Sequence, residues 1–336
     1  MASTQKSLTE WGVLIKEEAS YGAGGTLVAA DDGVLVNERP DVDHQYAHEG
    51  ARRGEAGPMG MGMKNVKKSG RFGTLTLVHE AAGAGAAYSA SQKPSLHTLL
   101  KIAGFDATLV TTEGAETYTY TPGSVTPTEP IGPGGVGEFY ARQQKAKLSG
   151  ILADLNISSD GPDIPVWEFP LSGMAELPTE ASVPEITYPV ILPPKAESIT
   201  LTLGSFATAI CRRFSLSLGR ELSARADQNS TGHKGYRAGR INPVLEVEIE
   251  ANSFVTTPFH SADGIDPYNL SELATAVALS LVVGSVKYNK WKISAPAAQL
   301  EPVDEGEDGP SATWTLRWAL KPSTPGLKDN LSILFD

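Results

Sequence analysis

The strongest constraint on the fold is an alternation of apolar and polar side chains that recurs along the chain. Apolar residues occupy every second position in residues 214–219, 245–250 and 313–320. Successive side chains of a β-strand point to opposite faces, so this period predicts half-buried antiparallel strands. The sequence therefore predicts a mainly β protein. Shorter segments of the same kind lie at residues 75–77, 118–120, 151–157, 167–171 and 199–203.

Helical signals are confined to two segments. The first is residues 94–103, where Pro94 suits the first turn, the leucines fall on one face and Gly104 can end the helix. The second begins at Asp266 and Pro267 and can run to Leu273. The apolar residues 278–283 that follow fit a helix or a strand equally well.

A proline-dense segment divides the chain into two parts of similar size. Because this density excludes a helix or a central strand, we place the connection between two modules there, at residues 1–185 and 186–336. Residues 147–169 and 213–248 share a strand, a polar excursion and an isoleucine-proline step, so module 2 is a candidate duplicate of module 1. The alternative is a decoration domain outside the main assembly. The prolines are Pro178, Pro184, Pro189, Pro193 and Pro194.

Charge and composition exclude several classes of protein. The 336 residues carry 28 basic and 39 acidic side chains, a net charge of -11, which disfavours general attraction to nucleic acid or anionic membranes. No apolar run approaches the roughly 18 residues of a membrane-spanning helix. The single cysteine permits no intrachain disulfide, and the N-terminus lacks an apolar signal core. We therefore expect folding in the cytoplasm of the cell that makes the chain.

A search for catalytic motifs identifies no nucleophile and base that can be paired. Residues 132–137 match a dinucleotide-binding pattern in letters, but no apolar strand precedes them, so a loop is favoured. His44 and His48 lack the glutamate of a zinc protease, and no serine lies in a nucleophile elbow. Cys211 lies in an apolar run and is expected to be a packed thiol. The sequence predicts no enzyme, no cofactor and no metal.

Three glutamates, Glu246, Glu248 and Glu250, recur at every second position and must share one face of a strand. Two interpretations stay open. The row is either an ordinary solvated face or the lining of an aqueous channel. The acidic run 304–308 is expected to be an exposed hairpin tip.

Two segments, residues 49–73 and 227–240, are rich in glycine and polar residues and lack a strand pattern. Long loops of this kind are usually functional or become ordered against a partner. The basic side chains of these loops suit contacts with acidic surfaces of neighbouring subunits. The candidate contact residues are Arg52, Arg53, Lys64, Lys67, Lys68, His233, Lys234 and Arg237.

Several phrases resemble the major tail tube proteins of long-tailed, siphovirus-like bacteriophages. Residues 11–26 resemble their opening strand followed by Lys-Glu and Tyr-Gly, and residues 95–105 with 116–122 resemble their helix and Tyr-x-Tyr strand. Residues 147–173 resemble their hairpin ending in Ser-Gly. The resemblance covers residues 8–180 best, and it rests on the order of the phrases.

The resemblance implies a structural virion protein with two tandem β-sandwich or barrel-like modules, whose inner sheets join between subunits into a β-barrel. Copies of the chain would form rings of three chains with pseudo-sixfold symmetry, or hexamers, stacked into a tail tube. Double-stranded DNA would pass through an acidic lumen, lined by Glu246, Glu248 and Glu250, during genome ejection. The other implied partners are the tape-measure protein, the tail terminator and baseplate or distal tail proteins. The tube would be assembled in the host cytoplasm and located in the virion.

Two other classes remain as alternatives. A receptor-binding or glycan-binding β-sandwich module would form discrete particles, although the sequence reveals no aromatic and acidic cluster for its site. A hydrolase on a β scaffold would need the catalytic pair that the search did not find.

Overall fold

A computed structural model of the chain describes residues 10–52, 64–123, 134–188, 191–227, 232–251, 254–255, 260–262 and 264–336. About half of the chain (50%) is in strands and 5% is in two short helices, which confirms the predicted mainly β class. The sheets are large and antiparallel, and the described strands do not close into a barrel. We call residues 10–188 the first half and residues 191–336 the second half.

One long sheet runs through both halves. Its strands follow the order β2, β3, β9, β8, β12, β15, β21, β20, and each neighbouring pair is antiparallel. The pairing of β8 with β12 joins the two halves into this sheet. The bounds are β2 (Asp43–Arg52), β3 (Lys64–Glu80), β9 (Val166–Ala175), β8 (Asn156–Asp160), β12 (Cys211–Ser217), β15 (Val244–Glu250), β21 (Ser311–Lys321) and β20 (Asp304–Asp308).

The remaining strands form a second layer. In the first half, β1 pairs with β6 and β6 with β7; β7 then pairs with the end of β9 and with β10. In the second half, β11 pairs with β18 and β18 with β19; β19 pairs with β21 and β22, and β22 continues to β5 and β4. The bounds are β1 (Trp11–Glu17), β4 (Phe105–Val110), β5 (Thr117–Pro122), β6 (Gly135–Ala141), β7 (Gln144–Ala153), β10 (Thr179–Glu180), β11 (Thr200–Leu203), β18 (Ala276–Val283), β19 (Trp291–Leu300) and β22 (Ser332–Phe335), with the two-residue strands β16 (His260–Ser261) and β17 (Gly264–Ile265) and a 3-10 turn at Ala196–Ser198.

Both predicted helices are present and both are short. Helix α1 (His97–Ile102) buries its leucines and is followed by Gly104 at φ +89, a conformation that glycine adopts without strain. Helix α2 (Pro267–Glu272) is capped by Asp266, whose carboxylate accepts a hydrogen bond from the amide of Asn269 at 3.1 Å. Residues 276–283, which fitted either structure, form strand β18.

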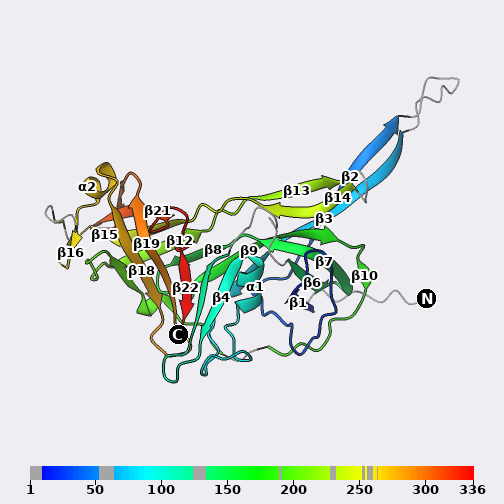
Figure 1. Cartoon of the computed structure of the whole chain (residues 1–336), viewed down its shortest axis with the longest axis horizontal. Helices are drawn as coiled ribbons and strands as arrows, with labels where there is room; N and C mark the ends of the chain where they lie inside the picture. Colours follow the sequence, from blue (N-terminus) through cyan, green and yellow to red (C-terminus); the bar gives the residue numbers. More distant parts are fainter. Residues whose placement is uncertain are drawn as a thin grey trace.

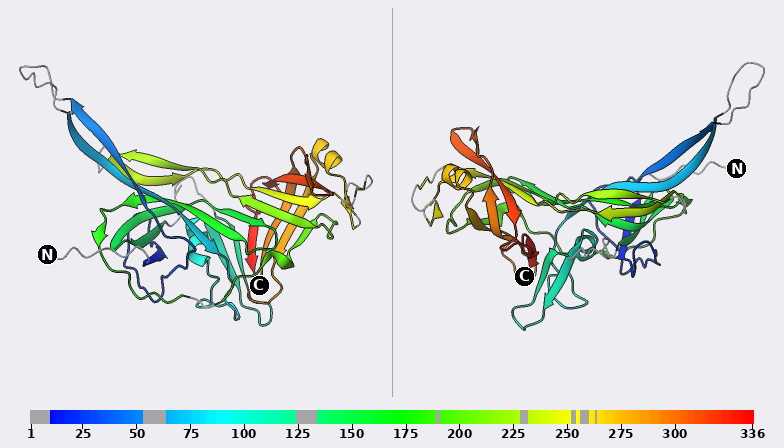
Figure 2. Two further views of the ribbon diagram at one scale, coloured as in Figure 1. Left: turned by 180° about the vertical axis from the view of Figure 1, so that it is seen from behind. Right: turned by 45° about the horizontal axis from the view of Figure 1, so that its top comes forward.

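The two segments expected to be loops are mostly hairpins, which corrects that prediction. Residues 49–73 belong largely to the hairpin of β2 and β3, and residues 227–240 to that of β13 (Leu222–Asp227) and β14 (Gly232–Ala238). The β2–β3 hairpin projects from the body, and β13 and β14 run beside β3 in the different views (Figures 1 and 2).

The core between the layers is continuous from one half to the other. Trp167 on β9 packs edge-on against Trp291 on β19 with 5.1 Å between ring centroids, and both rings are fully buried. Tyr120 on β5 meets Phe335 on β22 at 5.9 Å. Apart from β10 and the 3-10 turn, the described part of residues 178–199 has no regular structure. The module boundary placed there stays a prediction, since the halves share both a sheet and a core.

Candidate functional site: the polar face of the long sheet

The long sheet has one apolar face, packed on the core, and one polar face. Along β15, for example, Leu245, Val247 and Ile249 are fully buried, while the three intervening glutamates are partly exposed. The same alternation holds along β3, β9, β8, β12 and β21. We call the outward set the polar face. Its polar members are Thr76, Glu80, Asn156, Ser158, Asp160, Glu168, Arg213, Ser215, Ser217, Glu246, Glu248, Glu250, Thr315 and Arg317, and the apolar Val78, Val166, Pro170, Val244 and Ala319 lie on the same face.

Strand register places these side chains in rows across the sheet. One row crosses four strands through Ser158, Ser215, Glu246 and Arg317, each directly opposite the next. Side chains that are directly opposite in antiparallel strands are about 5 Å apart at Cβ, so each row is one contact chain. The polar face therefore extends across the junction of the two halves.

The glutamate row lies on one face, as its spacing predicts, but two of its members are ion-paired. Arg213 Nε lies 2.5 Å from Glu248 Oε2, and Arg212 lies 2.7 Å from Glu250 Oε1. Arg212 also pairs with Asp308 on β20. Such partly exposed pairs contribute at most about 1 kcal/mol each to stability. They reduce the negative potential at this end of the face, which the sequence pattern alone did not predict.

Shallow hollows follow the polar face. One of about 410 Å³ lies between β8, β12 and β15 and includes Ser158, Arg213 and Glu246 among its lining residues. Another of about 520 Å³ lies between β12, β15 and β21, beside Ser217 and Arg317. Serines and charged residues line both, and Phe214 is the one aromatic residue among the described residues that line them. The face is therefore suited to solvent more than to a small apolar ligand.

The groups with catalytic potential are individually inert or poorly oriented. Burial raises the pKa of the Cys211 thiol to about 12, and burial lowers the pKa of His79 and of His97 to about 4. Sequence reasoning missed one pair, Ser205 Oγ and His260 Nδ1, which are 3.0 Å apart although 55 residues separate them. In the described part of the chain no carboxylate bonds to this imidazole, so the third member of a triad is missing.

No metal or dinucleotide site is evident where the structure describes the chain. No group of three or more histidine, cysteine or acidic side chains there could hold a metal ion. Residues 135–141, at the end of the glycine-rich pattern, form strand β6 where a nucleotide-binding loop would start a helix. No helix in the described ranges is long and apolar enough to span a membrane.

The predicted contact residues of the two basic segments lie on the two hairpins. Strands β2 and β3 carry Arg52, Lys64, Lys67 and Lys68, and β14 carries His233, Lys234 and Arg237. Arg53 lies outside the described residues. Lys234 and Arg237 are exposed. Their contacts with another subunit stay a prediction.

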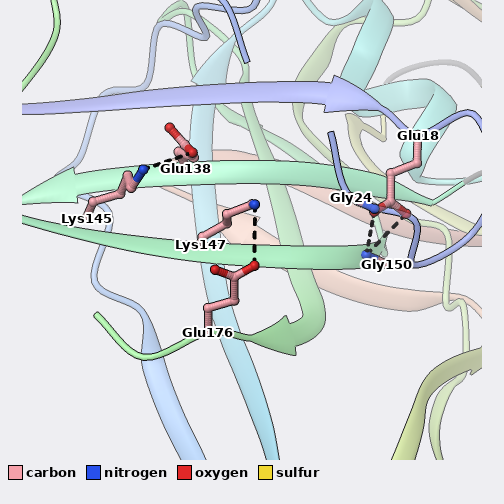
Figure 3. A network of polar contacts seen from close by, with 7 residues as sticks. All are labelled: Glu18, Gly24, Glu138, Lys145, Lys147, Gly150 and Glu176. Atoms are coloured by element: carbon pink, nitrogen blue, oxygen red, sulfur yellow. Dashed lines mark hydrogen bonds and ion pairs between the residues drawn. The ribbon is translucent and has the colours of Figure 1, made fainter. Parts of the chain in front are cut away.

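A second polar network holds the β13–β14 hairpin on the first half. The carboxylate of Glu18, only 3% exposed, accepts hydrogen bonds from the amides of Gly22, Gly24 and Gly150 at 2.7–3.2 Å. Figure 3 shows its contacts with Gly24 and Gly150. This loop presents Tyr21, whose hydroxyl accepts a 2.6 Å hydrogen bond from the amide of Tyr236 on β14. Sequence reasoning missed this contact, because nothing local links residues 215 positions apart.

Tyr236 also packs edge-on against Phe72 of β3, with 5.4 Å between ring centroids. The hairpin of the second half is therefore seated on the first half through the hydrogen bond between Tyr236 and Tyr21 and through a small apolar cluster that includes Leu152 and Ala238. Nearby, two further ion pairs of this region, Glu138 with Lys145 and Lys147 with Glu176, lie along β6 and β7 (Figure 3).

Comparison of the sequence with models of known protein families gives no match, and comparison with curated proteins gives no significant match.

Proposed function

We propose that the chain is the subunit of a tube, in which copies of the long sheet close into a continuous barrel around a hydrated lumen. The observation that carries this proposal is a long sheet with one polar face and open edges at both ends. In the described part of the chain, β2 pairs only with β3 and β20 only with β21. An open edge presents unpaired amides and carbonyls, and a closed ring of strands removes every such edge.

The arrangement of strands supports a duplication of one module. In the first half β1, β6, β7, β9 and β3 pair in succession, with β8 added to β9 and β2 to β3. In the second half β11, β18, β19, β21 and β15 pair in the same succession, with β20 added to β21 and β12 to β15. The order along the chain is also the same, with a short helix at the same point.

This correspondence differs from the one suggested by the sequence. The sequence pattern matched residues 147–169 with residues 213–248, whereas strand pairing matches β7 and β9 with β19 and β21. Isoleucine-proline steps recur in many β proteins and are a weaker guide than the pairing order. Two modules in each chain favour a ring of three chains with pseudo-sixfold symmetry over a ring of six.

The polar face supports the role of lumen wall for double-stranded DNA. Its acidic residues outnumber its arginines, and Arg213 is engaged by Glu248. Duplex DNA carries one charge per about 1.7 Å of axis, so a basic wall would hold it at many points while an acidic wall lets it slide. In this proposal the chain resembles the tail tube subunits of long-tailed bacteriophages in role, and the virion would be its location.

The test is electron microscopy of the purified full chain in negative stain, together with sedimentation velocity. We expect rings or stacked tubes with a stain-filled centre, in equilibrium with smaller species. A chain that stays monomeric at every protein concentration and salt concentration tested would contradict the proposal.

One observation favours the second candidate, a glycan-binding module. Phe254 and Tyr268 are exposed and lie beside the buried Trp314, with 6.3–6.4 Å between ring centroids, and Tyr268 donates a hydrogen bond to Glu305. Aromatic rings beside a carboxylate can stack on sugars. A glycan array, with Phe254→Ala as the matched negative, tests this candidate independently of assembly.

A further inference from the structure

We propose that the edge strand β20, with the aromatic group beside it, is the seam to a second copy of this chain. In that seam residues 39–43 of the second copy lie antiparallel to β20, as β12 lies against β8 within one chain. The inference rests on the proposed function and deepens it by naming the joined surfaces and their register.

Two tryptophans anchor the correspondence between the halves. Trp167 on β9 lies between His79 on β3 and Ile157 on β8. Trp314 on β21 lies between Ile249 on β15 and Glu305 on β20. Strand β20 therefore takes the place of β8.

The same register identifies the counterpart of β12. Asp43 is opposite Thr74 on β3, and Ser217 is opposite Val244 on β15. Thr74 precedes His79, the partner of Trp167, by as many residues as Val244 precedes Ile249, the partner of Trp314. The residues that precede Asp43 therefore match β12. Residues 39–42 form no ladder with β3, and the amide of Asn37 donates a hydrogen bond to the carbonyl of Val78 at 2.9 Å, so the chain lies beside β3 with two extra residues between Asn37 and Asp43.

The two positions differ in what covers them. Strand β8 has β9 on one side and β12 on the other. Strand β20 has β21 on one side, and no strand of the described chain on the other. All five residues of β20 are exposed. The described chain thus contains one complete pairing of this kind, between β8 and β12, and the two segments of a second such pairing, β20 and residues 39–43, which do not pair with each other.

The aromatic residues show the same difference. Trp167 is fully buried, packed on Trp291 and on Phe335 of the second half. Its counterpart Trp314 is backed by Phe254 and Tyr268, which are 54% and 41% exposed. An apolar patch next to an open strand edge is typical of a surface that another chain covers.

The register makes a definite prediction about charge. Within the chain Asp160 is opposite Arg213, and in the seam Asp308 comes opposite Arg39, where these two would exchange their present ion-pair partners, Arg212 and Asp41. Ser158 opposite Ser215 becomes Gly306 opposite Asp41. One row is unfavourable, since Asp304 comes opposite Asp43, and like charges directly opposite destabilise a sheet. Replacing Asp304 with asparagine should therefore favour assembly. If residues 304–308 were only a solvated hairpin tip, the substitution would leave assembly unchanged.

Disulfide trapping tests the seam directly. In a Cys211→Ser background, Asp41→Cys with Gly306→Cys should give interchain disulfides that end in a closed three-chain species under mild oxidation. Ser158→Cys with Ser215→Cys is the intrachain calibration, because the same strand geometry is present within one chain. Asp41→Cys with Glu307→Cys is the matched control, because residue 307 points to the opposite face.

The outcomes separate the two proposals. Rings that assemble but give no disulfide with the first pair, while the calibration pair oxidises, overturn the seam and leave the tube intact. A chain that never assembles overturns both. A disulfide in the control pair at equal yield overturns the register.

The aromatic group provides a second measurement. Phe254→Glu should raise the concentration needed for assembly about tenfold, equivalent to about 1.4 kcal/mol. The control is Leu327→Glu, at a residue that is also 54% exposed but lies away from β20, and it should have little effect. If Phe254→Glu assembles normally but no longer binds glycans, the aromatic patch is a glycan-binding site and is not part of the seam.

Discussion

At the scale of single residues, Glu18 is the clearest case of a buried charge that organises a loop. Its carboxylate is almost fully buried, and three backbone amides satisfy it. Removing such an acceptor leaves buried donors without partners, which costs about 1–3 kcal/mol and more for charged groups. We expect Glu18→Ala to lower the free energy of unfolding by about 3 kcal/mol in urea titrations.

Glu17 provides the matched control for this change. It is the preceding residue, and its partly exposed carboxylate pairs with Lys101 at 3.3 Å. Glu17→Ala should cost less than about 1 kcal/mol. Equal losses for the two variants would show that the amide contacts do not stabilise the loop.

His79 predicts a dependence of stability on pH. Burial holds its pKa at about 4 in the folded chain, against about 6.5 when unfolded. As the pH falls below 6.5 the unfolded state takes up the proton first, so stability is complete above 6.5 and declines towards pH 4. The slope is about 1.4 kcal/mol per pH unit for each such histidine.

The measurement is the free energy of unfolding between pH 7 and pH 4. His97 has a pKa of about 4 for the same reason and adds a second proton to the slope. His79→Gln should lower the slope of the free energy of unfolding against pH by the contribution of one proton, whatever its effect on stability at pH 7. An unchanged slope would mean that this imidazole is protonated in the folded chain.

At the scale of elements, the seating of the β13–β14 hairpin depends on Gly235. This residue has φ +84, and a Cβ atom there would collide with the ring of Tyr21. Gly235→Ala should therefore release the hairpin and speed hydrogen exchange in residues 222–238. Gly161→Ala is the control, because Gly161 has φ +68 in open space and would suffer only the backbone strain of about 1 kcal/mol. Equal exchange in both variants would contradict the seating.

Strands differ in how far the sequence predicts them, and the reason is burial on one side. The strands β12, β15 and β21 each have one face on the core and one in solvent, so their alternation is visible in the sequence. The β2–β3 and β13–β14 hairpins were predicted as loops; among the described side chains of β14 only Tyr236 and Ala238 are buried apolar residues, too few for a visible alternation. The glutamate row of β15 follows from spacing alone. Its arginine partners on β12 do not, because pairing between distant strands leaves no local signal.

At the scale of the whole molecule, the charge of the polar face decides how the proposed tube treats DNA. Glu168 and Glu246 lie on this face at different points along the sheet. Changing both to lysine should make assembled tubes bind duplex DNA, with affinity that falls steeply as salt rises. Glu272→Lys together with Glu113→Lys is the charge-matched control, since Glu272 lies on α2 and Glu113 is exposed between β4 and β5 of the second layer. Binding of DNA by both double variants would place the DNA outside the lumen.

The pairing of β8 with β12 has a consequence for kinetics. Because both strands belong to one polypeptide, alternate joints of a closed ring would form during folding and could not come apart on dilution. Only the remaining strand pairings would depend on encounters between molecules. A ring would therefore form from half as many separate chains as a ring of single modules. Covalent linkage would thereby keep the two kinds of module in strict alternation around the ring.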